Sequence, residues 1–322
     1  MFHRKQFRLN LPSRTLILGE RTLVMGVLNI TPDSFSDGGA YLDAGAAVAR
    51  ALEVEREGAD ILDVGGESTR PGSSPISAEE EIRRVVPVIE VLLGKLRIPI
   101  SIYTRKAEVA EAALDAGAEI LNDISALRGD PRLAEIAHRA HVPLVLMHMR
   151  GTPKTMQEGP FARDVIRDVI IGLRAAIARA RRGGLSKSQL ILDPGIGFGK
   201  KHEQNYEILS RLPELARLGC PILVGASRKS FLGKSMAGKG GPPVLVGGRL
   251  LGTAVAVTAS ILGGAHIVRV HDVAEIKQVA RVADEIQNHL QDRLRTRLNL
   301  PNRLLDTNLG PTDSPRRVPS MF

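Results

Sequence analysis

Short apolar runs alternate along the chain with longer segments that have helical periodicity. The apolar runs are rich in Val, Ile and Leu and lie at residues 23–30, 59–68, 98–104, 118–125, 142–149, 190–199, 221–227 and 265–273. Runs that are apolar on both faces are typical of buried parallel strands. The segments between them are Ala-rich, and glycine precedes several runs, as in EGAD, AGAE and GGAH. Each such glycine predicts a helix that ends in a left-handed residue immediately before a strand.

This alternation predicts eight strand–helix units and therefore a (β/α)8 barrel, the TIM barrel, over residues 23–288. Residues 1–22 are expected to form a lid or hairpin at the bottom of the barrel, and residues 289–322 a disordered basic tail. A doubly wound open sheet is the structural alternative. It is disfavoured because no GxGxxG motif follows the first predicted strand.

Polar residues stand at the carboxyl ends of these strands, where barrel enzymes carry their chemistry. In chain order they are Asn29, Asp63 with Glu67, Tyr103, Asn122 with Asp123, His148, Asp193, Ser227 with Arg228 and Lys229, and Arg269 with His271 and Asp272. Acids and amides dominate the middle strands, and cations dominate the seventh and eighth. We therefore expect one side of the rim to bind a neutral, donor-rich heterocycle and the other side a polyanion.

Composition narrows the class of partner. The chain has 322 residues, 43% of them hydrophobic and 25% charged, and no apolar run approaches the ~18 residues of a membrane span. The single cysteine, Cys220, excludes a disulfide within one chain and favours the cytoplasm. A net charge of +9 raises the question of nucleic acid, but only 3% of residues are aromatic and Trp is absent, so base-stacking platforms are scarce. We expect no nucleic-acid and no membrane partner, and we attribute the charge to solvated termini and anionic small molecules.

Several motifs together resemble one family. They are MGVLNITPDSFSDGG (25–39), DVGGESTRPG (63–72), NDIS (122–125), LMHMRGTP (146–153), LDPGIGFGK (192–200), GASRKSFLG (225–233) and RVHDV (269–273). In this order, over roughly residues 20–285, they resemble dihydropteroate synthase. That family condenses 6-hydroxymethyl-7,8-dihydropterin diphosphate with p-aminobenzoate, releases diphosphate in folate biosynthesis, and is the target of sulfonamides.

The resemblance implies a role for residues at matching positions. The implied pterin-binding residues are Asn122, Asp193, Lys229, Tyr103, Asp63, Met147 and Phe198. The implied diphosphate-binding residues are Asn29, Thr69, Arg70, Arg269 and His271. The implied p-aminobenzoate-binding residues are Ser227, Phe35 and Pro71. Among these, Lys229, Arg269, His271 and Asp193 are the expected catalytic residues. The family also implies Mg2+ as cofactor, with Asn29 as its ligand, and a homodimer that forms through barrel helices.

The residue types fit these roles, although each has a plainer interpretation. The Asp193 carboxylate can accept two parallel N–H bonds from a heterocycle edge, yet an Asp before a glycine-rich turn also caps that turn. Asn122 offers a donor and an acceptor, but a lone Asn often serves in a turn. Arg269 and His271 are two apart on a strand and so point to the same side, where they suit an anionic leaving group. A single Asn29 is a poor metal site, so Mg2+ should arrive with the substrate.

Mechanistically, the resemblance implies a dissociative substitution. The diphosphate departs first, the dihydropterin ring delocalises the cation, and the arylamine then attacks. An aniline nitrogen is already a free nucleophile at neutral pH, so the protein contributes orientation and electrostatics rather than a strong base.

Tyr103 departs from the family pattern. Family members carry VDT at the end of the third strand, where the acid accepts a pterin N–H, but this chain has IYT. A phenol with a pKa near 10 is neutral at pH 7, and loss of that charge would cost about 10²–10³ in rate. Three explanations stay open: a working enzyme, a weakened or non-catalytic pterin-binding paralogue, and a position altered in this particular chain. A pterin-dependent methyltransferase domain is a further alternative, but it would leave Asn29, Arg269 and His271 unexplained.

Overall fold

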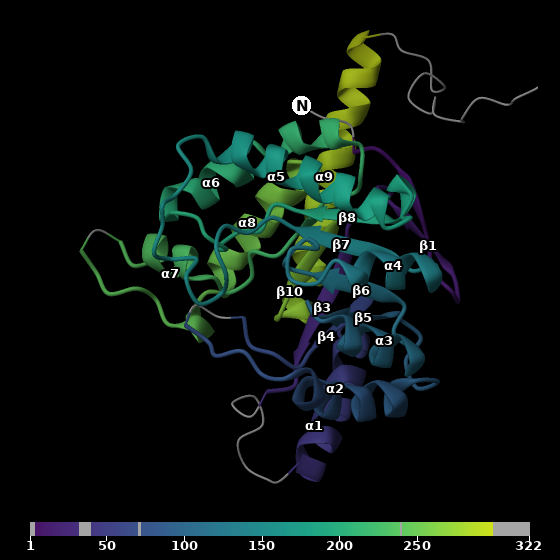
Figure 1. The fold of residues 1–322 in the computed structure, drawn as a ribbon. Coiled ribbons are helices and arrows are strands. Elements are labelled where there is room, and N and C mark those ends of the chain that lie inside the picture. Colours follow the sequence, from purple (N-terminus) through teal and green to yellow (C-terminus); the bar gives the residue numbers. More distant parts are fainter. Residues whose placement is uncertain (1–3, 32–39, 70–71, 239, 299–322) are drawn as a thin grey trace, which may run out of the picture.

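Eight parallel strands form a single sheet that curls into a barrel (Figure 1). The computed structural model describes residues 4–31, 40–69, 72–238 and 240–298. The strands are β3 (Leu23–Asn29), β4 (Ile61–Gly65), β5 (Ile100–Tyr103), β6 (Ile120–Asp123), β7 (Leu144–Met147), β8 (Leu190–Asp193), β9 (Leu223–Val224) and β10 (Ile267–Val270). They are ordered β8-β7-β6-β5-β4-β3-β10-β9, and a parallel bridge between Leu192 and Ile222 joins β8 to the β9 side. The predicted barrel is confirmed.

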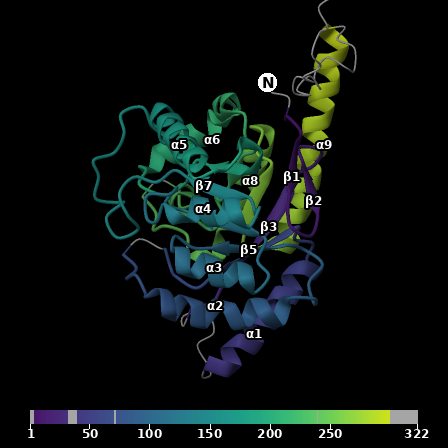
Figure 2. The same cartoon turned by 45° about the vertical axis from the view of Figure 1, so that its right-hand side comes forward.

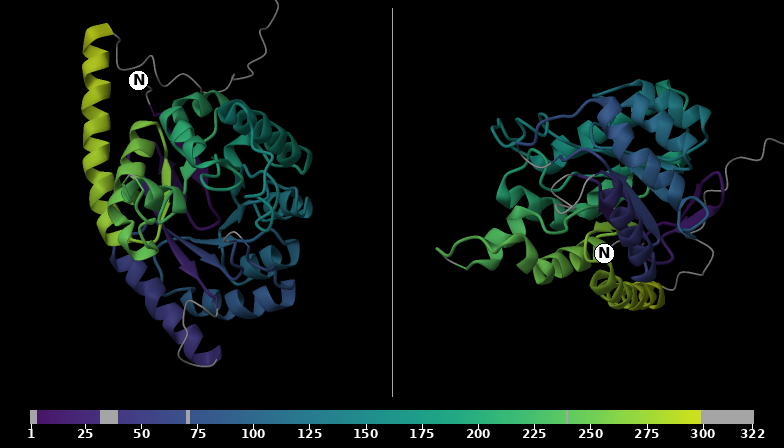
Figure 3. Two further views of the ribbon diagram at one scale, coloured as in Figure 1. Left: turned by 90° about the vertical axis from the view of Figure 1, so that its left-hand side faces the viewer. Right: turned by 90° about the horizontal axis from the view of Figure 1, so that it is seen from below.

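Helices follow the strands and cover the outside of the barrel (Figures 1 and 3). They are α1 (Ala40–Arg56), α2 (Ala78–Leu92), α3 (Ala107–Asp115), α4 (Arg132–Arg139), α5 (Val165–Arg182), α6 (His202–Ser210), α7 (Ser230–Met236), α8 (Leu250–Leu262) and α9 (Val273–Leu298). The glycines of EGAD, AGAE and GGAH have φ values of 100°, 113° and 95°. These left-handed residues end α1, α3 and α8 before the next strand begins, as their positions predict. Within the described residues, no helix is both long and apolar enough to cross a bilayer.

Helix α9 continues to Leu298 and extends past the barrel (Figure 3), whereas the sequence prediction ended the barrel at residue 288. The first part of the predicted disordered tail is therefore helical. Leu290, Leu294 and Leu298 have helical spacing, and the Arg and Gln residues between them are good helix formers. Residues 299–322 lie outside the described part of the chain.

A small antiparallel hairpin, β1 (Phe7–Asn10) and β2 (Thr15–Leu18), precedes the barrel and lies beside β3 and α9 (Figure 2). Its buried leucines share an apolar cluster with inward-facing residues of the barrel. This cluster consists of Leu9, Leu11, Leu18, Leu23, Met25, Ile61, Ile120, Val145, Ile191, Leu223 and Ile267. Arg4, next to the hairpin, donates to Asp284 of α9 at 2.9 Å. The hairpin therefore closes the amino end of the barrel and leaves the carboxyl end for chemistry.

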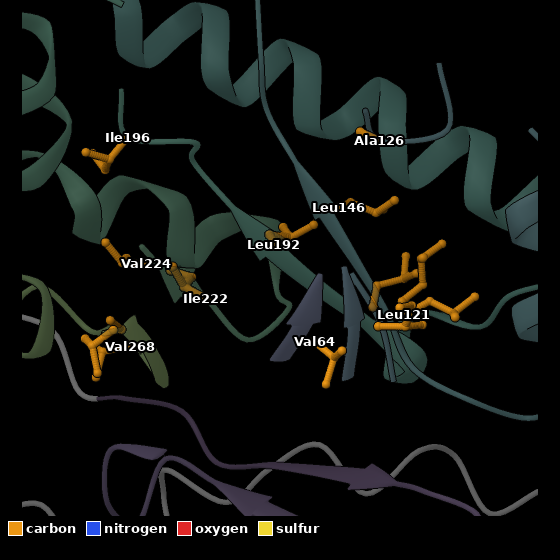
Figure 4. Packing of buried hydrophobic residues seen from close by; sticks show 14 of the residues in the cluster. Val64, Leu121, Ala126, Leu146, Leu192, Ile196, Ile222, Val224 and Val268 are labelled. Carbon is orange, nitrogen blue, oxygen red and sulfur yellow. The ribbon is translucent and has the colours of Figure 1, made fainter. Parts of the chain in front are cut away.

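Side chains alternate along each strand, and this alternation places the polar residues of the rim. Outward residues such as Val64, Leu121 and Val268 are buried in the cluster that joins the sheet to its helices (Figure 4). Inward residues change character toward the carboxyl end. On five strands, the residue two positions after an apolar inner residue also faces inward and lies at the rim. These pairs are Ile61 and Asp63, Ile120 and Asn122, Val145 and Met147, Ile191 and Asp193, and Ile267 and Arg269. One strand period therefore separates the hydrophobic floor from the polar rim.

Candidate active site

Asp63 lies at the centre of the polar network in the barrel mouth. It is fully buried on β4, and its Oδ2 accepts hydrogen bonds from Arg269 Nε at 2.6 Å and Asn122 Nδ2 at 3.1 Å. Its Oδ1 is also buried and has no partner among the described residues. A buried ion pair is stable only when further hydrogen bonds satisfy its atoms. This network therefore fixes Arg269 and Asn122 and leaves one buried carboxylate oxygen of Asp63 without a hydrogen bond from a described residue.

Asp193, at the end of β8, combines the two interpretations open from the sequence. Its Oδ1 accepts the Gly195 N–H at 2.6 Å and so caps the glycine-rich turn. The structure records no hydrogen bond to Oδ2 from a described residue. Burial raises the pKa of this carboxyl above its usual range, although the nearby Lys229 ammonium opposes the rise. Capping orients the side chain, and the second oxygen can accept from a ligand.

Lys229 lies at the start of α7, and its ammonium group contacts the same glycine-rich turn. Nζ donates to the Ile196 carbonyl and lies 4.4 Å from the ring centroid of Phe198. Burial lowers the pKa of Lys229 to about 8, because the charged form loses solvation. The ammonium is therefore a donor at neutral pH that titrates close to the physiological range.

This pKa predicts the alkaline limb of the activity profile. Lys229 can donate only while it is protonated, so kcat/KM should fall as pH rises through about 8. Steady-state rates measured from about pH 6 to 10 would show this limb, because kcat/KM reports the free enzyme. Lys229→Arg keeps its charge throughout this range and should lose the limb, whatever its absolute rate. An unchanged limb in that variant would assign the titration to another group.

His271 and Ser227 form a second polar pair. His271 Nδ1 and Ser227 Oγ are 3.1 Å apart, and the His271 backbone N–H donates to the same oxygen at 3.2 Å. The sequence pattern predicted that His271 and Arg269 share one direction, toward a diphosphate. In the structure each has its own partner at the end of β10, with His271 against Ser227 and Arg269 against Asp63.

The turn that carries Ser227 and Lys229 is built around Arg228, whose φ of 58° is left-handed. Its guanidinium pairs with Asp272, its N–H donates to Thr253 Oγ1 at 3.1 Å, and its carbonyl accepts from Arg249 Nη1 at 2.8 Å. A non-glycine residue with positive φ is strained and persists only when its surroundings fix it. These contacts turn Ser227 and Lys229 toward the barrel mouth.

Tyr103 ends β5 and lies in a small apolar cluster at the rim. The cluster comprises Tyr103, Ile124, Met147, Met149 and Met156, with Phe198 packed against it. The hydroxyl shares a hydrogen bond of 2.7 Å with Thr69 Oγ1, and the Arg269 guanidinium carbon lies 4.7 Å from the ring centroid. Burial raises the pKa of Tyr103 to about 12, so the phenol is neutral, as predicted. Met147, Phe198 and Tyr103 thus lie together as an apolar wall.

Some predicted site residues are not brought into this network. Asn29 is half-buried at the end of β3, opposite Gly65 of β4. Phe35, Arg70 and Pro71 lie outside the described residues. The described ranges contain no group of three or more His, Cys, Asp or Glu side chains that could hold a metal ion.

Lys200 is a residue of the rim that the sequence prediction did not assign to the site, and it contacts His148, which was predicted at a strand end but given no role. Lys200 Nζ donates to the carbonyls of His148 at 3.2 Å and Phe198 at 3.0 Å, and lies 3.2 Å from His148 Nδ1. Burial lowers the pKa of Lys200 to about 7 and that of His148 to about 4. Lys200 therefore ties the loop that bears Phe198 to the end of β7. The signal available was its place in LDPGIGFGK, directly after a buried strand.

The fold and the rim together define a class of protein. Asp193, Asn122 and Asp63 present acceptors and an amide beside an apolar wall, which suits a flat, donor-rich heterocycle. Arg269 and Lys229 place two cations at the same mouth, which suits an anion. The molecule is a barrel with a site for an anionic derivative of a polar heterocycle.

Comparison with known proteins gives the family. The family model described as pterin binding enzyme matches residues 25–271. The dihydropteroate synthase of Synechocystis sp. is 47% identical over 268 residues, which are 83% of this chain and 91% of that protein. The crystal structure of the Yersinia pestis dihydropteroate synthase in complex with a sulfonamide drug has a TM-score of 0.81 at 39% identity, covering 88% of this chain and 100% of that one. The Xanthomonas albilineans enzyme in complex with 7,8-dihydropteroate has a TM-score of 0.77 at 40% identity, covering 87% and 98%.

The chain therefore belongs to the pterin binding enzyme family and, within it, to the dihydropteroate synthases, which are transferases.

Proposed function

We propose that this chain condenses 6-hydroxymethyl-7,8-dihydropterin diphosphate with p-aminobenzoate and releases 7,8-dihydropteroate and diphosphate. The observation that carries the proposal is the buried Asp63 network, which holds Arg269 and Asn122 in one barrel mouth with Asp193 and Lys229. The barrel mouth therefore has hydrogen-bonding groups that can contact the edge of a heterocycle and cations that can bind an anion. The Xanthomonas albilineans relative was crystallised with 7,8-dihydropteroate, the proposed product.

The pterin is proposed to bind between the acceptors of the middle strands and the apolar wall. Asp193 Oδ2 accepts from the amino edge of the ring, and Asn122 contacts the neighbouring edge. Lys229 donates to the ring carbonyl, and its position above Phe198 keeps it at the edge of the wall. The Asp193 carboxylate is held in place by the hydrogen bond that it accepts from the Gly195 N–H, so pterin binding requires little reorganisation.

Arg269 and His271, with Thr69 and Arg70, are proposed to bind the diphosphate, and Ser227, with Phe35 and Pro71, the p-aminobenzoate. The exocyclic C–O bond breaks first, and its electron pair leaves on the diphosphate, whose growing charge Arg269 stabilises. The resulting cation is delocalised over the dihydropterin ring. The arylamine nitrogen then donates its electron pair to form the C–N bond and releases a proton to water. The 3.1 Å contact between His271 Nδ1 and Ser227 Oγ supports the proposal that the two subsites are neighbours.

Mg2+ is proposed to accompany the diphosphate, with Asn29 Oδ1 as the protein ligand. Asn29 is half-buried at the mouth, and the described residues provide no acidic cluster that could bind the ion alone. One amide oxygen fits an ion that keeps several waters and takes its other ligands from substrate phosphates. When bound, the ion neutralises charge on the leaving group.

Removal of Mg2+ is therefore expected to abolish turnover and to weaken diphosphate binding without changing the stability of the free protein. Asn29→Ala should raise the Mg2+ concentration needed for half-maximal rate by about 10-fold. Titration of Mg2+ into chelator-treated enzyme, with calorimetry of diphosphate binding as a second readout, measures both effects. An Mg2+ requirement that is identical in Asn29→Ala would remove this residue from the site.

The reaction itself is tested with the purified full chain. The chain is incubated with the pterin diphosphate, p-aminobenzoate and Mg2+, and diphosphate release is followed against a reaction without the arylamine. A sulfonamide should compete with p-aminobenzoate and leave the KM of the pterin substrate unchanged. Pterin binding without diphosphate release would contradict the proposal and indicate a non-catalytic pterin-binding paralogue.

We also infer a homodimer in the cytoplasm. The neighbouring helices α8 and α9 expose Leu251 and Val255, and Val282 and Ile286, respectively, at helical spacing. Two such pairs on adjacent helices form an apolar face that a second copy can cover. A monomer in sedimentation equilibrium at micromolar concentration would contradict the dimer, and Leu251→Glu is the variant expected to dissociate it.

The cytoplasmic location is inferred from the single cysteine. Cys220 is buried and unpaired, which suits a reducing compartment.

A further inference from the structure

Tyr103 lies between two side chains that are proposed to bind the diphosphate. Its hydroxyl shares a 2.7 Å hydrogen bond with Thr69 Oγ1, and the Arg269 guanidinium carbon lies 4.7 Å from its ring centroid. Thr69 follows β4, whereas Arg269 belongs to β10, at the far end of the barrel sequence. One side chain on β5 therefore connects two segments that are proposed to bind the same part of the substrate.

The ring is held in this position by close packing. Gly65 is the cross-strand neighbour of Tyr103, and a Cβ atom there would lie 3.3 Å from Tyr103 Cδ1. The ring thus rests against bare backbone, and it packs on its other sides in the cluster with Met147 and Ile124. The whole residue is buried. The orientation of the hydroxyl toward Thr69 is consequently fixed before any ligand binds.

An aspartate at the same position could not make these contacts. Its carboxylate ends nearer the strand than the phenol hydroxyl does, and it would compete with Asp63, which already accepts from Arg269 Nε at 2.6 Å. The face of a neutral ring attracts a guanidinium without neutralising it. Burial raises the pKa of the phenol to about 12, so it adds no charge of its own. Arg269 keeps its full charge, and its Nη atoms make no recorded hydrogen bond to a described residue.

We propose that Tyr103 is a positioning residue for the diphosphate, which supports the Arg269 guanidinium with its ring face and orients Thr69 with its hydroxyl. The inference rests on the proposed function, because it takes Arg269 and Thr69 as diphosphate-binding residues. In family members the acid at this position contacts the pterin ring, whereas Tyr103 acts on the binding of the diphosphate leaving group. Its effect should appear in the binding of diphosphate and of the pterin diphosphate, and not in the binding of p-aminobenzoate.

The test compares Tyr103→Phe, Tyr103→Leu and Tyr103→Asp with the wild-type chain. Binding of inorganic diphosphate with Mg2+ is measured by calorimetry, and the KM of each substrate by steady-state kinetics. Tyr103→Phe keeps the ring and should weaken diphosphate binding about 3- to 10-fold, whereas Tyr103→Leu also removes the cation–π contact and should weaken it about 10- to 100-fold. The loss should fall mainly on the KM of the pterin diphosphate, and thermal unfolding of the near-isosteric Tyr103→Phe confirms that it folds.

A double-mutant cycle with Thr69→Val isolates the hydroxyl contact. If Tyr103 acts through Thr69, Tyr103→Phe should have little further effect once the threonine hydroxyl is gone. Three outcomes would each overturn the proposal. Tyr103→Phe could weaken diphosphate binding equally with and without Thr69→Val, or Tyr103→Leu could leave diphosphate binding unchanged. A Tyr103→Asp variant could also turn over faster with undiminished diphosphate binding. These outcomes are distinct from failure of the proposed function, in which the wild-type chain itself would bind no diphosphate and release none.

Discussion

Asp193→Asn is expected to lower kcat/KM for the pterin diphosphate by about 10²–10³ while the protein stays folded. The asparagine oxygen can still accept the Gly195 N–H that now bonds to Oδ1 at 2.6 Å, so the turn keeps its cap. The second oxygen becomes an amide N–H2, which presents donors to the donor edge of the pterin. The charge near the cationic transition state is lost as well. Steady-state kinetics on both substrates and a thermal unfolding curve measure the separate effects.

Asp123→Asn is the matched control for Asp193→Asn. Asp123 is the last residue of β6, is fully buried, and accepts hydrogen bonds from Ser125 N at 2.7 Å, Ser125 Oγ at 2.6 Å and Leu127 N at 2.5 Å. Its acceptors are satisfied by its own turn, so replacement should cost about 1–3 kcal/mol of stability and little turnover. Comparable losses of kcat/KM in the two variants would indicate that buried charge in general, and not pterin binding by Asp193, explains the effect.

The barrel could be predicted from the chain because its signals are local and repeated. Continuous apolar runs show buried parallel strands, and a glycine before three of them shows where helices end. The period of two along a strand then places Asp63 and Asn122 on the same inner face as Ile61 and Ile120. This rule recovers most of the rim. The boundary at residue 288 rested on the basic composition of the tail and not on this rule, and the structure moves the end of the last helix to Leu298.

Contacts across the barrel mouth could not be predicted in the same way. Arg269 and Asp63 are on strands that are not adjacent, and a strand pattern gives direction but no distance between such strands. The pairing of His271 with Ser227 depends on the turn at Arg228, whose positive φ is set by tertiary contacts from α8 and Asp272. The orientation of the Tyr103 ring depends on the space above Gly65. Each of these is a property of packing and not of local sequence.

Arg269→Met is expected to lower kcat/KM for the pterin diphosphate by about 10²–10³, because the cation that stabilises the leaving group is lost. The same substitution should lower the free energy of unfolding by about 3–5 kcal/mol, since it leaves the fully buried Asp63 carboxylate with only Asn122 as a partner. Denaturant unfolding and steady-state kinetics therefore both change. The single variant alone cannot separate a catalytic loss from a structural one.

The double variant Asp63→Asn/Arg269→Met separates these two effects. Removing the carboxylate together with its cation leaves no unpaired buried charge, so most of the lost stability should return. Turnover should stay low, because nothing replaces the guanidinium that Asp63 and Tyr103 hold at the mouth. Recovery of turnover together with stability would show that Arg269 contributes only to the fold, and the diphosphate would then have to be bound by other groups. Recovery of stability alone would show that the lost turnover does not come from a weakened fold, and the rate of Asp63→Asn by itself then gives the part that belongs to the carboxylate and not to the guanidinium.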